Sequence, residues 1–510
     1  MKLKFLPLLG LLGAILACYL LTAPVGLTWE NAELYEGKLV TAVTQKKLAT
    51  FGTSPLYLLL SRPFLESSSN PAKNLNSLST FIAISILGVV AAAIYLLTKN
   101  HAATLIGTAF LATNPLFWKY GTNANYNVLS LLFYSLSLFF LLEKRYFLLG
   151  LACGLALSSS PQALIFGGLA LLLILKTKTP SKKKPPLAAY LTGLIAGASP
   201  LLLYLGSAPQ IVGESWLAWL LPLNLSPSAF TQSIIHQIEL IFGSTNGLFL
   251  VLAALGVLWE EKSKEKTLAV RILLLMLVAG VIFNVIRATP NPEIYLLPEI
   301  LILALLAGLC VDFLARLFTP LVKTKLAVAY ENRFFLLIIR LKDNSLLSQT
   351  LVYISLLILF LTPTIFGARE IVKTSQRGSR NEAQNYLDRV DHYLPTHALV
   401  LSDDPKIAQT LNYLTVLRPK KLVIVTATDF PYNQQSLDEL ASSGVTVPEQ
   451  VVFGEDQNQG LQLLTSTVQK ALLTREVYLA PTSPPPPNTV GTWQGFKLTS
   501  VGPLFKLTRE

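Results

Sequence analysis

Apolar stretches of about 17–25 residues, the length that spans the hydrocarbon core of a bilayer, recur along this sequence. Of the 510 residues, 52% are hydrophobic and only 14% are charged, and the mean hydropathy is +0.52. In soluble globular chains about a quarter of the residues are charged, so much of the surface of this chain is expected to face an apolar environment, such as the interior of a bilayer. The sequence therefore predicts a polytopic α-helical membrane protein.

The order of apolar and basic segments predicts about eleven spans. The first, about 5–22, follows Lys2 and Lys4 and lacks a small-residue cleavage site, so we expect an uncleaved span with a cytoplasmic N-terminus. A cleaved signal peptide is the alternative. Further spans are expected at about 77–97, 102–117, 127–142, 146–157, 161–175, 187–205, 240–259, 268–286, 296–317 and 349–366. In this order the pair 146–157 and 161–175 forms a hairpin with SSSPQ at or below the outer surface, and WKYGTNANY is a short outer loop.

The net charge of +12 could suggest a nucleic-acid partner, but its distribution excludes that class. Lysine and arginine gather in the short connectors that face the cytoplasm in this topology, as the positive-inside rule expects. The three cysteines lie inside apolar runs without CxxC spacing, and the four histidines are scattered, so neither a disulfide framework nor a metal site is indicated. Compact cytoplasmic connectors favour a prokaryotic plasma membrane.

Beyond the last span, the composition becomes polar and predicts an extracytoplasmic α/β domain. Residues 1–366 form the transmembrane domain, with 23–76 as its first outer loop; residues 367–482 form the α/β domain, and 483–510 a Pro-rich linker with a terminal β-hairpin. Strands are expected at ALVLS, KLVIVTA, EQVVFG and EVYLAP, and helices at RNEAQNYLDRVDHYL, PKIAQTLNYLTV and GLQLLTSTVQKALLT. Alternating strands and helices predict a small parallel sheet. Asp404 before Pro405 favours a helix N-cap over a metal ligand.

The segment LTWENAELYEG follows the first span and is expected just outside the membrane. Glu30, Glu33 and Glu36 are spaced by three, so on a helix they share one face. They can be solvated acids of an interfacial helix. Close carboxylates, however, also raise the pKa of one member, which makes a general base near neutral pH. The apolar run TSPLYLLLSRPFLES that follows is too short to span, so we expect it to lie flat or to re-enter.

Five segments in the same order resemble a GT-C-type glycosyltransferase family that includes protein O-mannosyltransferases and is designated glycosyltransferase family 117. They are Glu30–Leu34 (ENAEL), Ala49–Tyr57 (ATFGTSPLY), Phe117-Trp118 followed by NANYNVLSLLF, Pro292–Pro298 (PEIYLLP) and Asn381–Asp404. The resemblance implies a GT-C-like helical bundle that transfers a sugar, with inversion, on the outer side of the membrane. A sugar, with mannose as one candidate, would move from a polyprenyl-phosphate donor to an extracytoplasmic protein or glycan.

The resemblance also implies site residues. Glu33 matches the family's glutamate and is the expected base, with Glu30 as its partner or alternative. Arg62, Lys119 and Arg287 are the candidate cations for the donor phosphate, and Trp118, Asn125, Tyr126, Tyr57 and Tyr295 are the candidate groove residues. Glu30, Ala32, Thr50 and Asn125 depart from the family pattern. No cofactor is expected beyond the lipid-linked sugar itself, and the need for a divalent metal stays open. The alternative is a non-catalytic transporter, flippase or scaffold for lipid-linked sugars.

Overall fold

The computed structural model describes most of the chain, in the ranges 6–28, 54–66, 70–160, 163–176, 186–207, 227–244, 247–257, 264–287, 292–328, 369, 382–418, 420–426, 440–441, 444–445, 457–483 and 485–509. The chain divides into two compact units. The first, the helical unit, comprises Met1–Ala23, Gly52–Ser61 and Asn76–Ser375. The second, the α/β unit, comprises Pro24–Phe51, Arg62–Leu75 and Gln376–Glu510.

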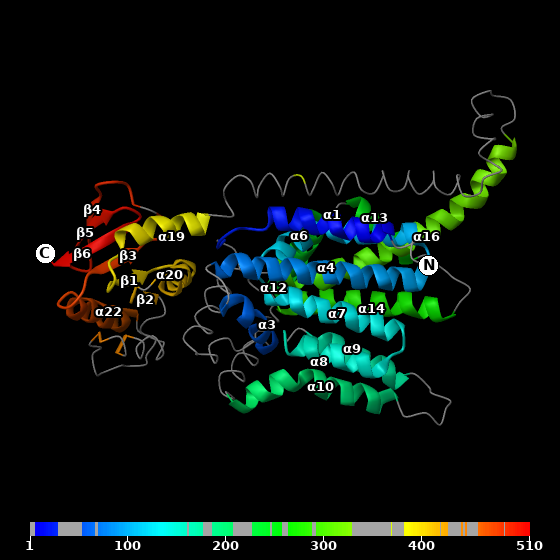
Figure 1. The fold of residues 1–510 in the computed structure, drawn as a ribbon, viewed down its shortest axis with the longest axis horizontal. Helices are drawn as coiled ribbons and strands as arrows, with labels where there is room; N and C mark the ends of the chain where they lie inside the picture. Colours follow the sequence, from blue (N-terminus) through cyan, green and yellow to red (C-terminus); the bar gives the residue numbers. More distant parts are fainter. Residues whose placement is uncertain are drawn as a thin grey trace. The chain divides into compact units, whose positions relative to one another are not determined.

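The helical unit is a bundle of apolar helices (Figure 1). Its described helices are α1 (Leu6–Thr22), α5 (His101–Thr113), α6 (Pro115–Thr122), α7 (Tyr126–Leu142), α8 (Tyr146–Leu157), α9 (Ala163–Lys176), α10 (Pro186–Ser207), α12 (Pro227–Ser244), α13 (Gly247–Val257), α14 (Lys264–Arg287), α15 (Pro292–Tyr295) and α16 (Leu297–Val328). Two more helices, α3 (Pro55–Glu66) and α4 (Pro71–Thr98), run from one unit into the other.

Three of the described helices are long and apolar enough to cross a membrane by themselves, over Pro71–Thr98, Thr267–Val285 and Leu297–Ala315. The pair α6 and α7 counts as a fourth if it is a single broken span. Apolar helices of 10–17 residues cover five more of the predicted segments. The predicted span at about 240–259 falls on both α12 and α13, and the one at about 349–366 lies outside the described residues. The total of about eleven therefore stays a prediction.

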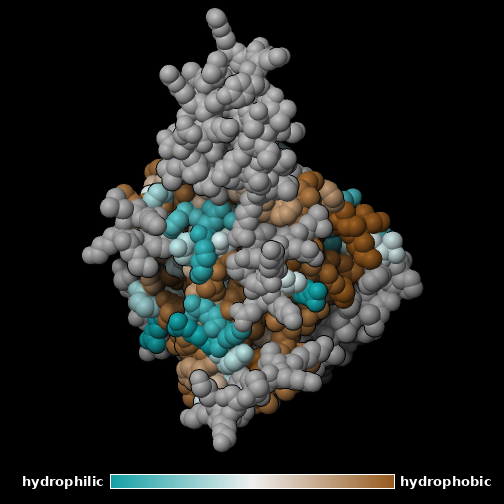
Figure 2. All heavy atoms as spheres, turned by 90° about the vertical axis from the view of Figure 1, so that its right-hand side faces the viewer, coloured by the Kyte–Doolittle hydropathy of each residue, from teal (hydrophilic) through white to brown (hydrophobic). Residues whose placement is uncertain are grey.

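Large apolar side chains lie exposed on the helices of this unit, as lipid-facing residues do. Examples on α10 and α14 are Ile195, exposed at 63%, and Val278, at 52%. Figure 2 looks along the helices at one end of the bundle, where hydrophobic residues (brown) lie beside patches of hydrophilic residues (teal). Exposed apolar side chains along the helices are stable beside hydrocarbon, where they need no water. The described helices thus form an integral membrane bundle.

Helices α8 and α10 touch along a seam of glycines. A Cβ atom on Gly150 or Gly154 of α8 would lie 2.0 Å from the Tyr190 carbonyl oxygen and 2.3 Å from that of Leu194, respectively. On α10, a Cβ on Gly193 or Gly197 would lie 2.1 and 2.2 Å from backbone oxygens of α8. Each helix thus carries two glycines four residues apart, the small-residue pattern that lets membrane helices pack backbone to backbone.

The α8–α9 connection is buried in the bundle. Ser158, Ser159 and Ser160 are all at most 1% exposed. The start of α3 closes over them: the Leu56 amide donates to the Ser158 carbonyl oxygen at 3.1 Å, and the Ser54 hydroxyl donates to the carbonyl of Ser159. At about 18 Å, the 12 residues of α8 are too short for a full crossing. The position of the turn relative to the membrane surface stays a prediction.

The α/β unit contains a six-stranded mixed sheet with strand order β2-β1-β3-β6-β5-β4. Its elements are α19 (Glu382–Tyr393), β1 (Leu399–Ser402), α20 (Pro405–Leu417), β2 (Val423–Thr426), α22 (Gln457–Ala471), β3 (Val477–Ala480), β4 (Val490–Trp493), β5 (Phe496–Val501) and β6 (Leu504–Arg509). Strands β2, β1 and β3 are parallel and lie within predicted strands. Their buried Val and Leu side chains form one core with Phe496, Leu498 and Leu507 of the antiparallel part. The predicted strand EQVVFG lies outside the described residues.

The terminal strands belong to the same sheet, because β6 pairs antiparallel with β3. Gln494 and Gly495 connect β4 to β5 with φ angles of 51° and 81°, the left-handed pair that a two-residue hairpin turn requires. Gly502 connects β5 to β6 at φ 59°, and a Cβ there would lie 2.3 Å from the Tyr393 ring. Asp404 caps α20 as predicted, its Oδ1 accepting a 2.8 Å hydrogen bond from the Lys406 amide.

Two segments of the first outer loop also belong to the α/β unit. The Ala72 amide donates to the Tyr413 hydroxyl at 3.1 Å, which attaches the start of α4 to α20. Asn70 Nδ2 donates to the Val25 carbonyl oxygen at 3.1 Å. Parts of the chain that are more than 300 residues apart in sequence therefore share this unit.

Candidate functional site at a bent helix pair

The chain bends by 117° between α6 and α7. We call residues 114–127 the elbow. Asn114 begins it: its Oδ1 accepts hydrogen bonds of 3.1 Å from the Leu116 and Phe117 amides, with Pro115 at the first helical position. Asn125 then caps α7, its Oδ1 accepting a 2.8 Å bond from the Asn127 amide. Asn and Pro are strong helix-start residues, so each asparagine begins a new helix direction.

This geometry corrects the prediction of a short outer loop at WKYGTNANY. The first five residues of that stretch lie in α6, which runs to Thr122, and Trp118 and Tyr120 are buried. Helices α6 and α7 together are long and apolar enough for a single span broken at the bend, and the side of the membrane on which the bend lies stays a prediction.

Side chains of α4 satisfy the backbone at the bend. Asn76 Oδ1 accepts a 2.8 Å hydrogen bond from the Ala124 amide, and Ser79 Oγ accepts a 3.3 Å bond from the Asn125 amide. Non-helical backbone within an apolar bundle is stable only when its polar groups find such partners. Hydrogen bonds to α4 therefore stabilise the bend.

Several polar atoms at the elbow have no hydrogen-bond partner within the described part of the chain. They are Asn123 Oδ1, Asn125 Nδ2, both polar atoms of Asn127, and Thr80 Oγ1 on α4, and all five are buried. Each such orphan costs about 1–3 kcal/mol, and most buried polar groups in native proteins are paired. The set contains donors and acceptors without net charge, which suits hydroxyl groups of a ligand.

The Lys119 ammonium group lies at the outer face of α6 and is engaged by α15. Its Nζ lies 3.1 Å from Glu293 Oε2, and the Tyr120 hydroxyl donates to the same oxygen at 3.2 Å. The pair is partly exposed, at 28% for Lys119 and 36% for Glu293. Partly exposed ion pairs contribute about 0–1 kcal/mol, so the contact between Lys119 and Glu293 adds little to stability.

Trp118 is a packing residue in this geometry. Its indole Nε1 donates to the Thr22 hydroxyl at 3.0 Å, and its ring lies 4.8 Å from that of Tyr19. The Tyr19 hydroxyl in turn donates to the Ala112 carbonyl oxygen at 2.6 Å. Trp118 thus fastens α6 to α1 and α5, and at 6% exposure it offers little surface to a groove.

The buried carboxyl group of Glu299 is linked to the end of α15 through Asn284. Glu299 is 1% exposed, and Asn284 of α14 bridges its Oε1 at 3.2 Å and the Tyr295 carbonyl oxygen at 2.9 Å. Gly280 makes room for the carboxylate, since a Cβ there would lie 2.1 Å from Glu299 Oε1. This triad fixes the short helix that carries Glu293.

The structure brings together part of the predicted site. Lys119, Asn125, Tyr126 and Trp118 share the elbow, and α15 adds Tyr295, which is half-buried. Tyr57 is buried on α3, and the exposed Arg62 of α3 belongs to the α/β unit. The proposed bases Glu30 and Glu33 lie outside the described residues, as does the side chain of Arg287.

The sequence prediction missed most of the polar partners. Asn76 and Ser79 lie in a largely apolar helix, and only the fold shows that they contact the bend. The sequence does contain a signal for Asn123 and Asn127, because asparagines at alternate positions between two apolar runs are unusual in a membrane span and suggest a polar site. Glu293 was part of a matched motif but was not assigned to the site.

No family model matches the sequence, and no curated protein is similar to it. The solved structures that share its fold include ArnT from Cupriavidus metallidurans bound to undecaprenyl phosphate, and the same protein in the apo state. Each has a TM-score of 0.64 over 98% of this chain and 97% of that chain, at 13% and 12% sequence identity. The chain therefore has the GT-C fold that the resemblance implies. The narrower likeness to O-mannosyltransferases stays a prediction.

Proposed function

We propose that this protein is a membrane glycosyltransferase that takes a sugar from a polyprenyl-phosphate donor and transfers it to an extracytoplasmic protein or glycan. The observation that carries the proposal is the fold shared with ArnT over 98% of the chain, because one of those ArnT structures binds undecaprenyl phosphate. The elbow adds buried polar atoms without partners among the described residues, within an apolar bundle, and such atoms can pair with the hydroxyl groups of a sugar.

The reaction is an inverting displacement. The Glu33 carboxylate takes the proton of an acceptor hydroxyl while that oxygen forms a bond to the anomeric carbon, and the bond from that carbon to the phosphate oxygen breaks. The polyprenyl phosphate leaves with the bonding electrons. Glu30 raises the basicity of Glu33 through like-charge proximity. Cationic groups stabilise the negative charge that develops on the leaving phosphate.

Lys119 is the phosphate partner that the described contacts support best. Its ammonium already binds a carboxylate oxygen at 3.1 Å, so an anion-binding geometry exists before the donor arrives. Arg62 and Arg287 are further candidates for binding the donor phosphate. Mannose is one candidate for the transferred sugar. The orphaned amides of Asn123, Asn125 and Asn127 can then pair with sugar hydroxyls.

The proposal is tested by reconstitution of the full chain with a radiolabelled polyprenyl-phosphate sugar and a cell-envelope extract. We expect Glu33→Gln to lower transfer about 10²–10⁴-fold, the usual contribution of a general base, and Glu36→Gln, the matched control, to leave it unchanged. Transfer that survives Glu33→Gln would overturn the base assignment. Absence of transfer from every donor tried would overturn the enzyme assignment.

A transporter or flippase of lipid-linked sugars is the second candidate, and the bent pair α6–α7 is the observation that favours it, since transporters use broken helices. Vesicles with a fluorescent polyprenyl-phosphate lipid separate the two functions. A flippase moves the lipid between leaflets without any acceptor, whereas the transferase releases free polyprenyl phosphate only when acceptor is present.

A further inference from the structure

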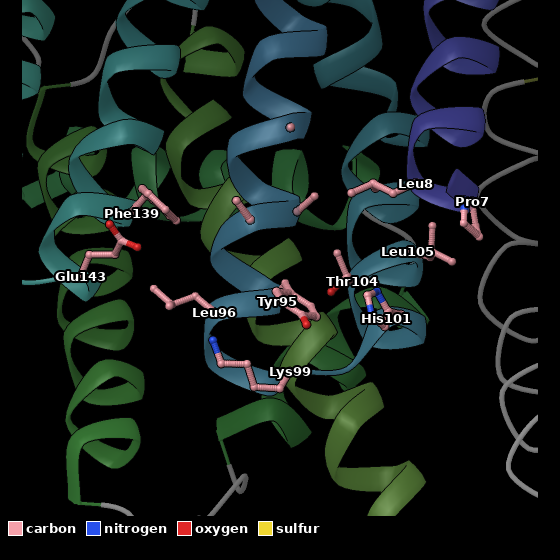
Figure 3. A pocket seen from close by; sticks show the side chains of 13 residues that line it. Pro7, Leu8, Tyr95, Leu96, Lys99, His101, Thr104, Leu105, Phe139 and Glu143 are labelled. Atoms are coloured by element: carbon pink, nitrogen blue, oxygen red, sulfur yellow. The ribbon is translucent and has the colours of Figure 1, made fainter. Parts of the chain in front are cut away.

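A cavity of about 310 Å³ lies in the helical unit between α1, α4, α5 and α7 (Figure 3). It is at the opposite end of α4 from the elbow. Ser79 contacts the elbow and Lys99 lies at the cavity, and these 20 positions correspond to about 30 Å of helix, the thickness of a hydrocarbon core. The cavity therefore opens in the leaflet opposite the elbow, which the topology predicts to be cytoplasmic.

Small residues on one face of α4 create the space. Gly88, Ala91 and Ala92 line it, and a Cβ atom on Gly88 would meet no heavy atom within 4 Å. Leucine, proline and phenylalanine side chains from the neighbouring helices form the other walls. An apolar space of this volume suits a hydrocarbon chain and offers few polar partners to a water-soluble ligand.

The polar end of the cavity carries a cation. Lys99 follows α4 directly with a left-handed backbone, φ 55°, and its exposed side chain places Nζ 5.4 Å from the centre of the Tyr95 ring. The Tyr95 ring lies 4.9 Å from that of His101, which begins α5. Figure 3 shows Lys99, Tyr95 and His101 grouped at the same end of the cavity.

The acidic groups near this end have basic or polar partners. Glu143 lines the cavity, but its Oε2 lies 2.7 Å from Arg145 Nε, so the pair adds no net charge. The buried Asp312 accepts a 2.8 Å hydrogen bond from Asn100. Among the described residues that line the cavity, Lys99 supplies a cation, and its ammonium group borders the apolar walls.

We propose that this cavity binds one anionic phospholipid of the surrounding bilayer, with an acyl chain against Gly88, Ala91 and Ala92 and the headgroup phosphate at Lys99. The argument is the match of charge and depth: an apolar slot that ends in a cation at headgroup level. Basic residues at helix ends commonly reach to this level, and here the residue also borders a space for the chain. The inference is independent of the proposed transferase activity.

Native mass spectrometry of the full chain in detergent tests the proposal, with phosphatidylglycerol, phosphatidylcholine and inorganic phosphate as probes. We expect the wild type to retain one phosphatidylglycerol with about fivefold preference over phosphatidylcholine, the effect of one basic residue near an anionic surface. Lys99→Ala removes the preference. Gly88→Leu fills the slot and lowers retention of both lipids, and Gly88→Ala gives a smaller loss if the leucine variant does not fold.

The controls are matched in kind. Gly168→Leu also places a side chain where a Cβ meets nothing within 4 Å, on an exposed face of α9, and Lys497→Ala removes an exposed cation from β5. Both behave as the wild type. Unchanged lipid retention in folded Gly88→Leu, an unchanged preference in Lys99→Ala, or displacement of the lipid by inorganic phosphate would each overturn the proposal.

Discussion

Asn76 of α4 accepts the hydrogen bond of the Ala124 amide at 2.8 Å, and this contact satisfies the backbone where α6 and α7 part. The bond has a consequence for stability, because the amide is buried and would otherwise lack a partner. Removal of the acceptor exposes the full cost of an unpaired buried donor, about 1–3 kcal/mol.

We therefore expect Asn76→Ala to lower the free energy of unfolding by about 1–3 kcal/mol and to lower sugar transfer as the elbow loses its shape. Thermal unfolding in detergent and the transfer assay measure the two effects. Ser85→Ala is the control, since the Ser85 hydroxyl bonds only its own helix on an exposed face. Equal behaviour of the two variants would contradict the support role of Asn76.

Asn127→Leu separates a ligand role from a structural role. Both polar atoms of Asn127 are buried without partners in the described residues, so a leucine of similar size should leave stability unchanged or raise it. If the amide binds sugar hydroxyls, KM for the donor rises about 3–10-fold for each hydrogen bond lost, with kcat less affected. Steady-state kinetics measure this, and an unchanged KM would exclude Asn127 from the sugar site.

Substitutions of Lys119 and Glu293 should have different effects on donor binding. Lys119→Met should weaken binding of polyprenyl phosphate about 10–100-fold, because a charge-assisted contact worth about 1.5–3 kcal/mol is lost. Glu293→Gln removes the competing carboxylate and should strengthen binding or leave it unchanged. Equilibrium binding of the lipid to both variants decides the matter; weaker binding in Glu293→Gln would show that Glu293 positions Lys119.

The glycine seam predicts a large loss of stability from a single methyl group. A Cβ on Gly154 would approach the Leu194 carbonyl oxygen to 2.3 Å, and backbone cannot move aside as a side chain can. Gly154→Ala should therefore destabilise the protein by about 1–3 kcal/mol or more. Gly168→Ala on α9 meets nothing within 4 Å and should be neutral or slightly stabilising in thermal unfolding.

Glu476 gives the α/β unit a pH dependence. Hydrogen bonds from Lys506 and Tyr478 lower the pKa of Glu476 below its ordinary value of 4.5. Its folded-state pKa is lower than its unfolded one, so its contribution is full above about pH 4.5 and is lost as the pH falls through the folded-state value. Because both side chains are partly exposed, we expect at most about 1 kcal/mol. Glu476→Gln should remove this part of the acid sensitivity of unfolding.

The elements that depend on neighbouring residues in the sequence, such as single strands and helix caps, could be predicted from the sequence. The strands β1, β2 and β3 lie in short runs of Val, Ile and Leu, and the Asp404-Pro405 cap was recognised from two neighbouring residues. The same type of signal at Asn114-Pro115 marks the start of α6, but there it lies inside an apolar stretch and the stretch was interpreted as one span.

The candidate site depends on contacts between distant segments, which periodicity does not reveal. Asn76 and Ala124, or Asn284 and Glu299, become partners only when their helices pack. The seam of α8 and α10 did have a signal in its glycines four residues apart, yet only the fold shows that the two pairs face each other. The fold class was thus predictable, whereas the polar contacts of the elbow were not.

The seam between α8 and α10 also limits how the bundle can deform. Helices slide past each other when interlocked side chains exchange rotamers, but at these four glycines main chain rests on main chain and has no rotamer to exchange. The two helices therefore translate together as one stiff plate. Any opening between helices of this unit is therefore expected at a seam other than that of α8 and α10.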